Sequence, residues 1–450
     1  MKFNSSILLL PLATGFKSDL GRSYTVTDDV VDAKLCGNEK AKSLSGYLSV
    51  KGSEFDSKSD KELFYWMFES QEAPAEAPFV VWLTGGPGCS STLALLSENG
   101  PCSVNKDGTG TLPNPNSWNA KANVLWLDQP AGVGFSYGSQ NDKDQEMIAE
   151  DAYYFLQTFF EAHPEYSKNE LFLFGESYGG HYAPAISNRI MQGNTEGKEG
   201  TQNLNLAGLG VGNGLTSPEI QYAYYPQMAY NNSHNIQTVD EKTYESMLAA
   251  VPKCQGMIKK CNEDDNQCSR AYTYCNQALT SPYYKSGLNP YDIRKECGDN
   301  PLCYDFTNVE TWLTTQSTLD ALHVTSASAK WQSCNTQINK QFKNDWMKRF
   351  DPFVKDLLEG GVRVMIYAGD VDFICNSLGN KAWTLGFDWS GKEAFNGAGD
   401  KDWNSGAGTI RQSGGLTFLE VSEAGHMVPS DQPVVALSML NDFLANTLAA

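Results

Sequence analysis

Six runs of the chain have the composition of buried strands, with β-branched and aromatic residues inside and glycine, proline or acidic residues at the end. They are FVVWLTGG (79–86), ANVLWLDQP (122–130), LFLFGES (171–177), LNLAGLGVGNG (204–214), VRVMIYAGD (362–370) and LTFLEVSEAGH (416–426). The stretch from about 142 to 163 instead has helical periodicity. Because strands alternate with helical segments, we predict an α/β fold with a mostly parallel central sheet covered by helices on both faces.

The alternation is interrupted twice. Upstream, runs 43–50 and 61–70 predict an antiparallel hairpin that precedes the sheet. Between about 215 and 350 there is no long apolar strand, and this stretch contains seven of the eleven cysteines. We therefore predict a helical, disulfide-stapled cap insertion at 215–350, between core segments at 17–214 and 351–450.

The N-terminus reads MKFNSSILLLPLATGF, in which one lysine precedes a short apolar run that ends in small residues. This pattern predicts a secretory signal peptide at 1–16, and a buried N-terminal strand is the structural alternative. No later apolar run approaches the roughly 18 residues of a membrane span. We expect a protein of the secretory pathway, either secreted or delivered to a vacuole or lysosome-like compartment, and its oligomeric state is open.

Charge narrows the set of partners. The formal net charge is −19 and the pI is about 4.7, and no stripe of lysine or arginine stands out. Nucleic acid and anionic membranes are therefore poor candidates, whereas an acidic lumen would suit such a surface. We expect no cofactor. The one glycosylation sequon outside the signal begins at Asn231.

The cysteines favour disulfides over a metal site. Short C-x-x-C pairs, which zinc sites use, are absent from the sequence. Cys254, Cys261, Cys268 and Cys275 recur every seven residues, so adjacent members lie on one helix face. A helical hairpin with nested bridges 254–275 and 261–268 fits this spacing, and the odd total leaves one cysteine unpaired.

The segment GESYG (175–179) matches G-x-S-x-G directly after a predicted strand and before a predicted helix. A serine on such a tight turn presents its hydroxyl above the sheet edge, and the flanking glycines let the turn close. Ser177 is therefore the candidate nucleophile. The structural alternative is a glycine-rich turn that binds nothing.

A nucleophilic serine needs a base and an orienting acid. Of five histidines, His426 follows the last strand, where an α/β sheet exposes its site. His181 lies on the helix after Ser177, so we expect it to pack or hydrogen-bond. The acid should lie between serine and histidine, and the sequence supplies both Asp370 and Asp372 after one strand; spacing alone does not choose between them.

A second glycine-rich turn, GGPG at 85–88, follows another predicted strand. Its backbone N–H groups can face the site and form an oxyanion hole together with the N–H of Tyr178, the residue after the nucleophile. A plain turn is the alternative. Two such turns and the acid and base loops all lie at strand C-termini, which points to one catalytic site.

Seven motifs in this order resemble the serine carboxypeptidases of the α/β-hydrolase fold, above all their vacuolar members. They are WLTGGPGCSS, LDQPAGVGFSY, GESYGGHYAP, GNGLTSP, NPYDIRKEC, YAGDVDFICN and GHMVP, and the likeness extends from about 43 to 445. The resemblance implies a peptidase that removes single C-terminal amino acids from peptides and proteins. It implies a Ser177, Asp372 and His426 triad, with Gly86 and Tyr178 as backbone oxyanion donors.

The resemblance also assigns the substrate-binding residues. It implies that the substrate's C-terminal carboxylate is bound by Thr84, Gly85, Glu98 and Glu176. Of the remaining substrate-pocket residues, Trp82 is expected to support this carboxylate-binding network. Trp346, Ile374 and Cys375 match the wall of the pocket beside the scissile bond, and Met427 matches the pocket of the leaving residue.

Disulfide pairs follow from the same resemblance. The implied bridges are Cys89–Cys334, Cys254–Cys275, Cys261–Cys268 and Cys297–Cys303. Cys375 would be the free thiol. We propose that the two remaining cysteines, Cys36 and Cys102, pair with each other.

One position departs from the family pattern, because Thr84 stands where asparagine is usual before GGPG. Acyltransferase relatives share the threonine, so an acyltransferase using the same triad is the alternative function. A catalytically inactive binding protein is a third. A substrate carboxylate held against Glu98 and Glu176 requires a shared proton, so we expect an acidic pH optimum.

Overall fold

A mixed sheet of 13 strands forms the centre of the computed structural model, which describes residues 15–37, 40–52, 60–300 and 302–448. The sheet order is β1-β2-β3-β4-β8-β5-β10-β11-β14-β17-β16-β15, with β9 paired to β4. The strands of this sheet are β1 (Gly15–Lys17), β2 (Ser23–Val31), β3 (Ser43–Lys51), β4 (Lys61–Phe68), β5 (Phe79–Leu83), β8 (Asn123–Leu127), β9 (Tyr137–Gly138), β10 (Leu171–Glu176), β11 (Leu206–Gly212), β14 (Arg363–Gly369), β15 (Lys401–Trp403), β16 (Gly408–Ser413) and β17 (Leu416–Val421).

The six strands from β8 to β17 pair in parallel, and each lies within one of the six predicted runs. Every residue of β5, β8 and β10 is buried, which explains why the runs are continuously apolar. The prediction of a parallel sheet is confirmed for this centre. The edges are antiparallel, including the predicted β3–β4 hairpin.

Helices cover both faces, as predicted. Side chains alternate between two apolar cores: Val81 and Leu173 enter one, Val80 and Phe172 the other. The first core is closed by α2 (Gln145–Ala162), α3 (Gly179–Glu196), α12 (Asp351–Glu359) and α13 (Ser377–Gly386). The second is closed by α1 (Ser91–Ala94), α9 (Thr307–Leu313), α10 (Gln316–Ala321) and α16 (Pro433–Leu444). The short helices α14 (Lys392–Gly397) and α15 (Val428–Asp431) and the hairpin β6 (Cys102–Val104) with β7 (Thr111–Pro113) complete the two layers.

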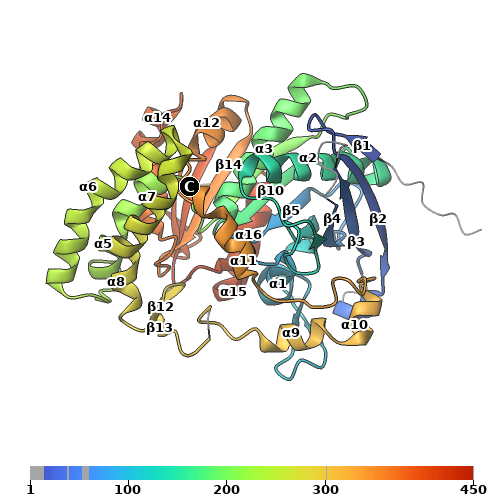
Figure 1. Cartoon of the computed structure of the whole chain (residues 1–450), viewed down its shortest axis with the longest axis horizontal. Helices are drawn as coiled ribbons and strands as arrows, with labels where there is room; N and C mark the ends of the chain where they lie inside the picture. Colours follow the sequence, from blue (N-terminus) through green and yellow to red (C-terminus); the bar gives the residue numbers. More distant parts are fainter. Residues whose placement is uncertain (1–14, 38–39, 53–59, 301, 449–450) are drawn as a thin grey trace, which may run out of the picture.

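The stretch between β11 and α12 is helical apart from one short hairpin, as the sequence predicts. Its remaining elements are α4 (Pro218–Gln221), α5 (Tyr225–Tyr230), α6 (Glu241–Glu263), α7 (Cys268–Cys275), α8 (Ser281–Tyr284), β12 (Leu288–Asn289), β13 (Asp292–Glu296) and α11 (Thr336–Gln341). Helices α5 to α8 lie together at the left of Figure 1, opposite the blue strands β2 and β3. The domain boundaries at 214 and 350 stay a prediction.

Five disulfides join the described cysteines, in the same pairs that were expected. They are Cys36–Cys102, Cys89–Cys334, Cys254–Cys275, Cys261–Cys268 and Cys297–Cys303. The Cys254–Cys275 and Cys261–Cys268 bridges connect α6 and α7 as nested staples. Cys375 is free and buried.

At the N-terminus, all but two residues of the predicted signal peptide lie outside the described residues. The described chain begins in β1, which pairs antiparallel with β2. Among the described helices, none is both long and apolar enough to span a bilayer.

Candidate active site

The candidate nucleophile lies on a strained turn between β10 and α3. Ser177 has φ +61°, a left-handed conformation that non-glycine residues rarely adopt. Its carbonyl accepts hydrogen bonds from the N–H of Gly180 and of Leu215, at 3.0 and 2.9 Å, which hold the strained backbone. A Cβ on Gly175 would lie 2.3 Å from the carbonyl oxygen of Gly179, so this turn closes only with glycine there. The predicted strand–turn–helix geometry is present.

His426 and Asp372 come together although 54 residues separate them. The His426 Nδ1 lies 2.8 Å from Asp372 Oδ2, and the aspartate is fully buried. The N–H groups of Ile374 and Cys375 donate to the Asp372 carboxylate at 3.0 and 3.2 Å. These donors fix the Asp372 carboxylate in the orientation in which it can align the imidazole of His426. His426 lines the same cavity as Ser177.

Asn213 gives the acid a further partner that the sequence reasoning missed. Its Nδ2 donates to Asp372 Oδ2 at 2.8 Å, and its Oδ1 accepts from the N–H of Gly369 at 3.2 Å. The residue follows β11 and has φ +41°. One sequence feature could have identified Asn213 as a site residue. It is a polar residue directly after a buried parallel strand, in the motif GNGLTSP.

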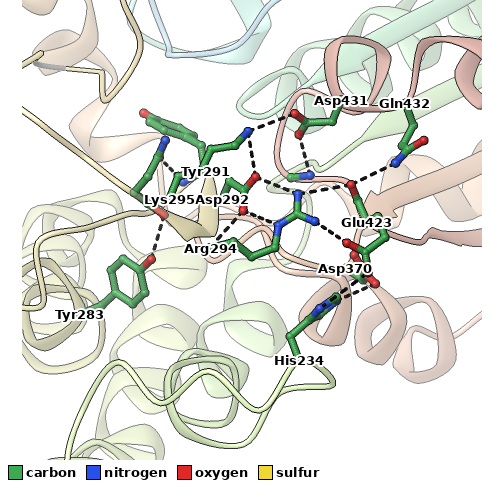
Figure 2. A network of polar contacts seen from close by, with 12 residues as sticks. His234, Tyr283, Tyr291, Asp292, Arg294, Lys295, Asp370, Glu423, Asp431 and Gln432 are labelled. Atoms are coloured by element: carbon green, nitrogen blue, oxygen red, sulfur yellow. Dashed lines mark hydrogen bonds and ion pairs between the residues drawn. The ribbon is translucent and has the colours of Figure 1, made fainter.

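The alternative acid and base are engaged elsewhere. Asp370 Oδ2 lies 2.9 Å from His234 Nε2 in the cap, as Figure 2 shows, so the two aspartates of the doublet have different partners. His181 is fully buried, with Nδ1 2.5 Å from the Leu215 carbonyl oxygen. Burial lowers the pKa of His181 to about 4, so its imidazole stays neutral and packs against the nucleophile turn.

The GGPG turn lies directly against the residue after the nucleophile. A Cβ on Gly85 would lie only 2.3 Å from the Tyr178 nitrogen, so no larger residue fits there. Gly86 has φ +107°, and the Cys89 N–H donates to the Gly85 carbonyl at 3.1 Å, which closes the turn. Gly86 and Tyr178 both line the cavity that contains Ser177, as an oxyanion hole requires.

Two carboxyl groups, Glu98 and Glu176, are buried beside Ser177, with 7% and 3% of each residue exposed. Among the described residues, one oxygen of each has no hydrogen-bond partner. Burial raises the pKa of Glu98 to about 7; for Glu176, burial and then the charge of Glu98 raise the pKa well above its ordinary value. The pair therefore holds at least one proton in acid, and it can donate that proton to a third carboxylate.

Thr84 is held with its hydroxyl available. Trp82 Nε1 donates to Thr84 Oγ1 at 2.9 Å, and the Thr84 N–H donates to Ser91 Oγ at 3.0 Å. Because the hydroxyl oxygen accepts from Trp82, its own proton is free for a ligand. Trp82 itself is fully buried and lines neither of the two cavities at this site, so it contacts the carboxylate-binding residues only through Thr84.

Two adjoining cavities meet at Ser177 and Gly86. The smaller, of about 80 Å³, contains the carboxylate pair, His426 and the predicted Met427. The larger, of about 430 Å³, contains the predicted Trp346, Ile374 and Cys375. Sequence reasoning missed most of the aromatic walls, which are Tyr291, Tyr304 and Phe306 in the smaller cavity and Tyr222, Tyr225, Tyr272, Tyr284 and Tyr291 in the larger.

Two of the expected disulfides differ in their relation to these cavities. Cys89 and Cys334 line both cavities. Cys297 and Cys303 are bonded as expected but line neither cavity, so this pair is not part of the site itself. Their bridge closes the short loop that contains Leu302, which lines both cavities, and it therefore supports the wall from outside.

Known proteins resemble the chain over nearly its whole length. A model of the serine carboxypeptidase family matches residues 35–446. A carboxypeptidase Y homolog A from Leptosphaeria maculans is 41% identical over 433 residues, which cover 94% of this chain and 77% of the relative. A homolog from Talaromyces stipitatus is 42% identical over 416 residues, covering 90% and 72%.

A solved structure agrees with these relatives. The crystal structure of Kex1, a prohormone-processing carboxypeptidase from Saccharomyces cerevisiae, superposes with a TM-score of 0.80 at 28% identity. The match covers 90% of this chain and 92% of that one. The family model, the relatives and the fold agree, and the chain therefore belongs to the serine carboxypeptidase family.

Proposed function

We propose that this protein is a serine-type carboxypeptidase that removes single amino acids from peptide and protein C-termini through an acyl-enzyme. The observation that carries the proposal is the buried pair Glu98 and Glu176 beside Ser177. An esterase has no use for two carboxyl groups that must share a proton. An enzyme that binds a substrate carboxylate does, because that proton forms the hydrogen bond.

The chemistry follows from the positions of the groups. Ser177 Oγ attacks the last peptide carbonyl while His426 Nε2 takes its proton, and Asp372 stabilises the resulting imidazolium. The N–H groups of Gly86 and Tyr178 stabilise the oxyanion. His426 then protonates the leaving amine, the C-terminal amino acid departs, and water attacks the acyl-enzyme with His426 again acting as base.

Substrate selection divides between the two cavities. The C-terminal carboxylate binds the Glu98 and Glu176 pair, the Thr84 hydroxyl and the backbone at Gly85. The leaving residue then occupies the smaller cavity, whose apolar wall includes Met427. The residue before the scissile bond occupies the larger, tyrosine-rich cavity, which favours apolar and aromatic side chains.

An acyltransferase on the same triad is the second candidate, and the threonine at position 84 favours it. The two functions differ in the acceptor of the acyl group, which is water in one and an alcohol in the other. Incubation with N-blocked dipeptides, and separately with acyl-glucose donors and an alcohol, distinguishes them. We expect release of the C-terminal amino acid; ester transfer without peptide cleavage would overturn the proposal.

We further propose that the protein works in a vacuole-like acidic compartment or outside the cell. Its five disulfides support the secretory pathway, since such bonds persist in oxidising compartments. Asn231 is exposed at the end of α5, which is compatible with its predicted glycosylation. A release assay on blocked dipeptides from pH 4 to 8 tests the acidic optimum.

A further inference from the structure

A single stretch of the cap contacts both loops that carry the candidate acid and base. This stretch, Asn289–Lys295, reads NPYDIRK and includes β12's last residue and the start of β13; we call it the NPYDIRK segment. The sequence singles it out as a motif, but the triad mechanism gives it no role.

Backbone hydrogen bonds attach the NPYDIRK segment to the acid loop. The carbonyl of Pro290 accepts from the N–H groups of Phe373 and Ile374, both at 3.0 Å. The Ile293 N–H donates to the Val371 carbonyl, also at 3.0 Å. These bonds flank Asp372 on both sides, so the conformation of the acid loop depends on the segment.

The same segment holds the base. The N–H of His426 itself donates to the Tyr291 carbonyl at 2.8 Å, and the Tyr291 ring lies 5.1 Å from the imidazole between centroids. Gly425 lies so close that a Cβ there would be 2.3 Å from the Tyr291 oxygen and 3.2 Å from the Asp292 Cβ. His426 is thus packed against the cap rather than free in a loop.

A charged network around Asp292 completes the connection, as Figure 2 shows. Asp292 is fully buried and accepts from Arg294 Nε and Nη2 at 2.9 Å, and its Oδ2 lies 2.9 Å from Lys295 Nζ. Arg294 extends to Glu423, and Lys295 lies 3.4 Å from Asp431. Asp431 Oδ2 in turn accepts from the Gly425 N–H at 2.8 Å.

The remaining charged groups near the NPYDIRK segment are His234 and Asp370, and Asp370 lies on the same loop as Asp372. His234 Nε2 lies 2.9 Å from Asp370 Oδ2, and its Nδ1 is 4.0 Å from Glu423. Ion pairs that face water contribute little individually, and the Glu423 side chain is 61% exposed. The buried carboxylate of Asp292, with two cationic partners, is therefore the group on which the arrangement depends.

We propose that Asp292 is a positioning residue, which holds the NPYDIRK segment so that His426 and Asp372 stay aligned with Ser177. This inference rests on the triad proposed above. Burial by itself raises the pKa of Asp292. The hydrogen bonds from Arg294 and Lys295 together outweigh this effect, so the pKa lies below its ordinary value. The carboxylate is therefore charged throughout the working pH range. The cap then serves the chemistry as well as substrate selection.

The test compares Asp292→Asn with Asp400→Asn in the full chain. Asp400 also pairs with one lysine and one arginine, Lys381 and Arg411, from two different elements, but lies outside the site. For Asp292→Asn we expect kcat on a blocked dipeptide to fall about 10- to 100-fold with KM changed less than about twofold, because misalignment slows the chemical step. Asp400→Asn should leave both constants unchanged.

A purely structural role would not alter the protonation of His426. A loosened Asp372–His426 contact stabilises the imidazolium less, so the ascending limb of the kcat profile should shift to lower pH in Asp292→Asn. The downfield NMR proton of the His426 Nδ1–Asp372 bond should weaken or shift in this variant alone. An unchanged kcat, pH limb and proton resonance would overturn the proposal.

Two further measurements keep the proposal falsifiable. If Asp292→Asn does not fold, Arg294→Ala, whose side chain is 29% exposed, should lower kcat in the same direction, and Arg294→Lys should restore part of it. An Arg294→Ala protein with wild-type kcat would then refute the role. The His426 Nδ1 proton resonance can be recorded without turnover. If the unmodified protein shows this resonance but cleaves no peptide, the proposed function is contradicted. The positioning role of Asp292 is then judged from the resonance of the variants.

Discussion

The buried pair Glu98 and Glu176 makes a quantitative prediction about substrate affinity. Binding of the substrate carboxylate requires a proton on the pair, and the pKa of Glu98 is raised to about 7. For a single proton with that pKa, KM for a free-acid peptide rises about tenfold between pH 6 and 8, or about 1.4 kcal/mol. Replacing Glu98 by glutamine, a neutral side chain of the same shape, removes the Glu98 titration, and burial still holds the pKa of Glu176 well above its ordinary value. We expect the KM of Glu98→Gln to change less than about threefold over the range.

The assay is steady-state cleavage of one N-blocked dipeptide as free acid and as C-terminal amide, from pH 5 to 8.5. The amide lacks the carboxylate, so its KM should not follow the titration of the pair. Glu296→Gln, an exposed glutamate in β13, serves as the matched control and should keep the wild-type slope. Equal slopes for wild type and Glu98→Gln, or for acid and amide, would refute the reasoning.

The Glu98 carboxyl also makes the stability of the folded protein depend on pH, in a direction that its pKa determines. The folded-state pKa of Glu98 lies above its unfolded value of about 4.5, so the folded state holds the proton more tightly. Its contribution to stability is present in acid and is lost as the pH rises from about 4.5 through 7, by up to about 3 kcal/mol. We therefore expect Glu98→Gln to have a higher Tm than the wild type at pH 8, measured by calorimetry. A lower Tm at that pH would contradict this sign.

Three further substitutions test other parts of the account. Gly85→Ala should lower kcat on a chromogenic ester at least about 100-fold while circular dichroism stays native, because its Cβ would displace the Tyr178 N–H; an active variant would remove the oxyanion assignment. Trp82→Phe should raise KM for free-acid peptides about fivefold through loss of the Thr84 contact, about 1 kcal/mol, with kcat unchanged; a kcat effect alone would argue against this. Lys61→Met removes the lysine partner of buried Asp142 and one of the two cationic partners of buried Asp151, which keeps Arg22, and should cost about 3–5 kcal/mol in urea unfolding; a neutral result would show that these ion pairs are dispensable.

The sequence predicts the centre of this fold well and its edges poorly. The six central strands lie between two cores, so burial on both faces makes each of them an apolar run. Strand β2, Ser23–Val31, lies near the sheet edge and reads SYTVTDDVV, in which polar residues separate the apolar ones. Strand β15 has only three residues. Neither pattern differs enough from a loop to be recognised without its partner strand.

At the site, spacing identified the groups that belong to one turn and missed those that meet across the fold. The Ser177 turn was predictable because strand, glycines and helix are consecutive. Asp370 and Asp372 follow the same strand, and only their partners, His234 and His426, distinguish them. Asn213 reaches the acid across 159 residues, a contact that no local pattern encodes.

The most direct test of the central claim measures product release and Ser177 modification on the same sample. An organofluorophosphonate is added in steps, the occupancy of the Ser177 peptide is followed by mass spectrometry, and release of the C-terminal amino acid from a blocked dipeptide is assayed at pH 5. We predict that only the single terminal residue is released and that its rate falls linearly to zero as Ser177 occupancy reaches one. Release that persists at full occupancy, or no release from the unmodified protein, would contradict the account.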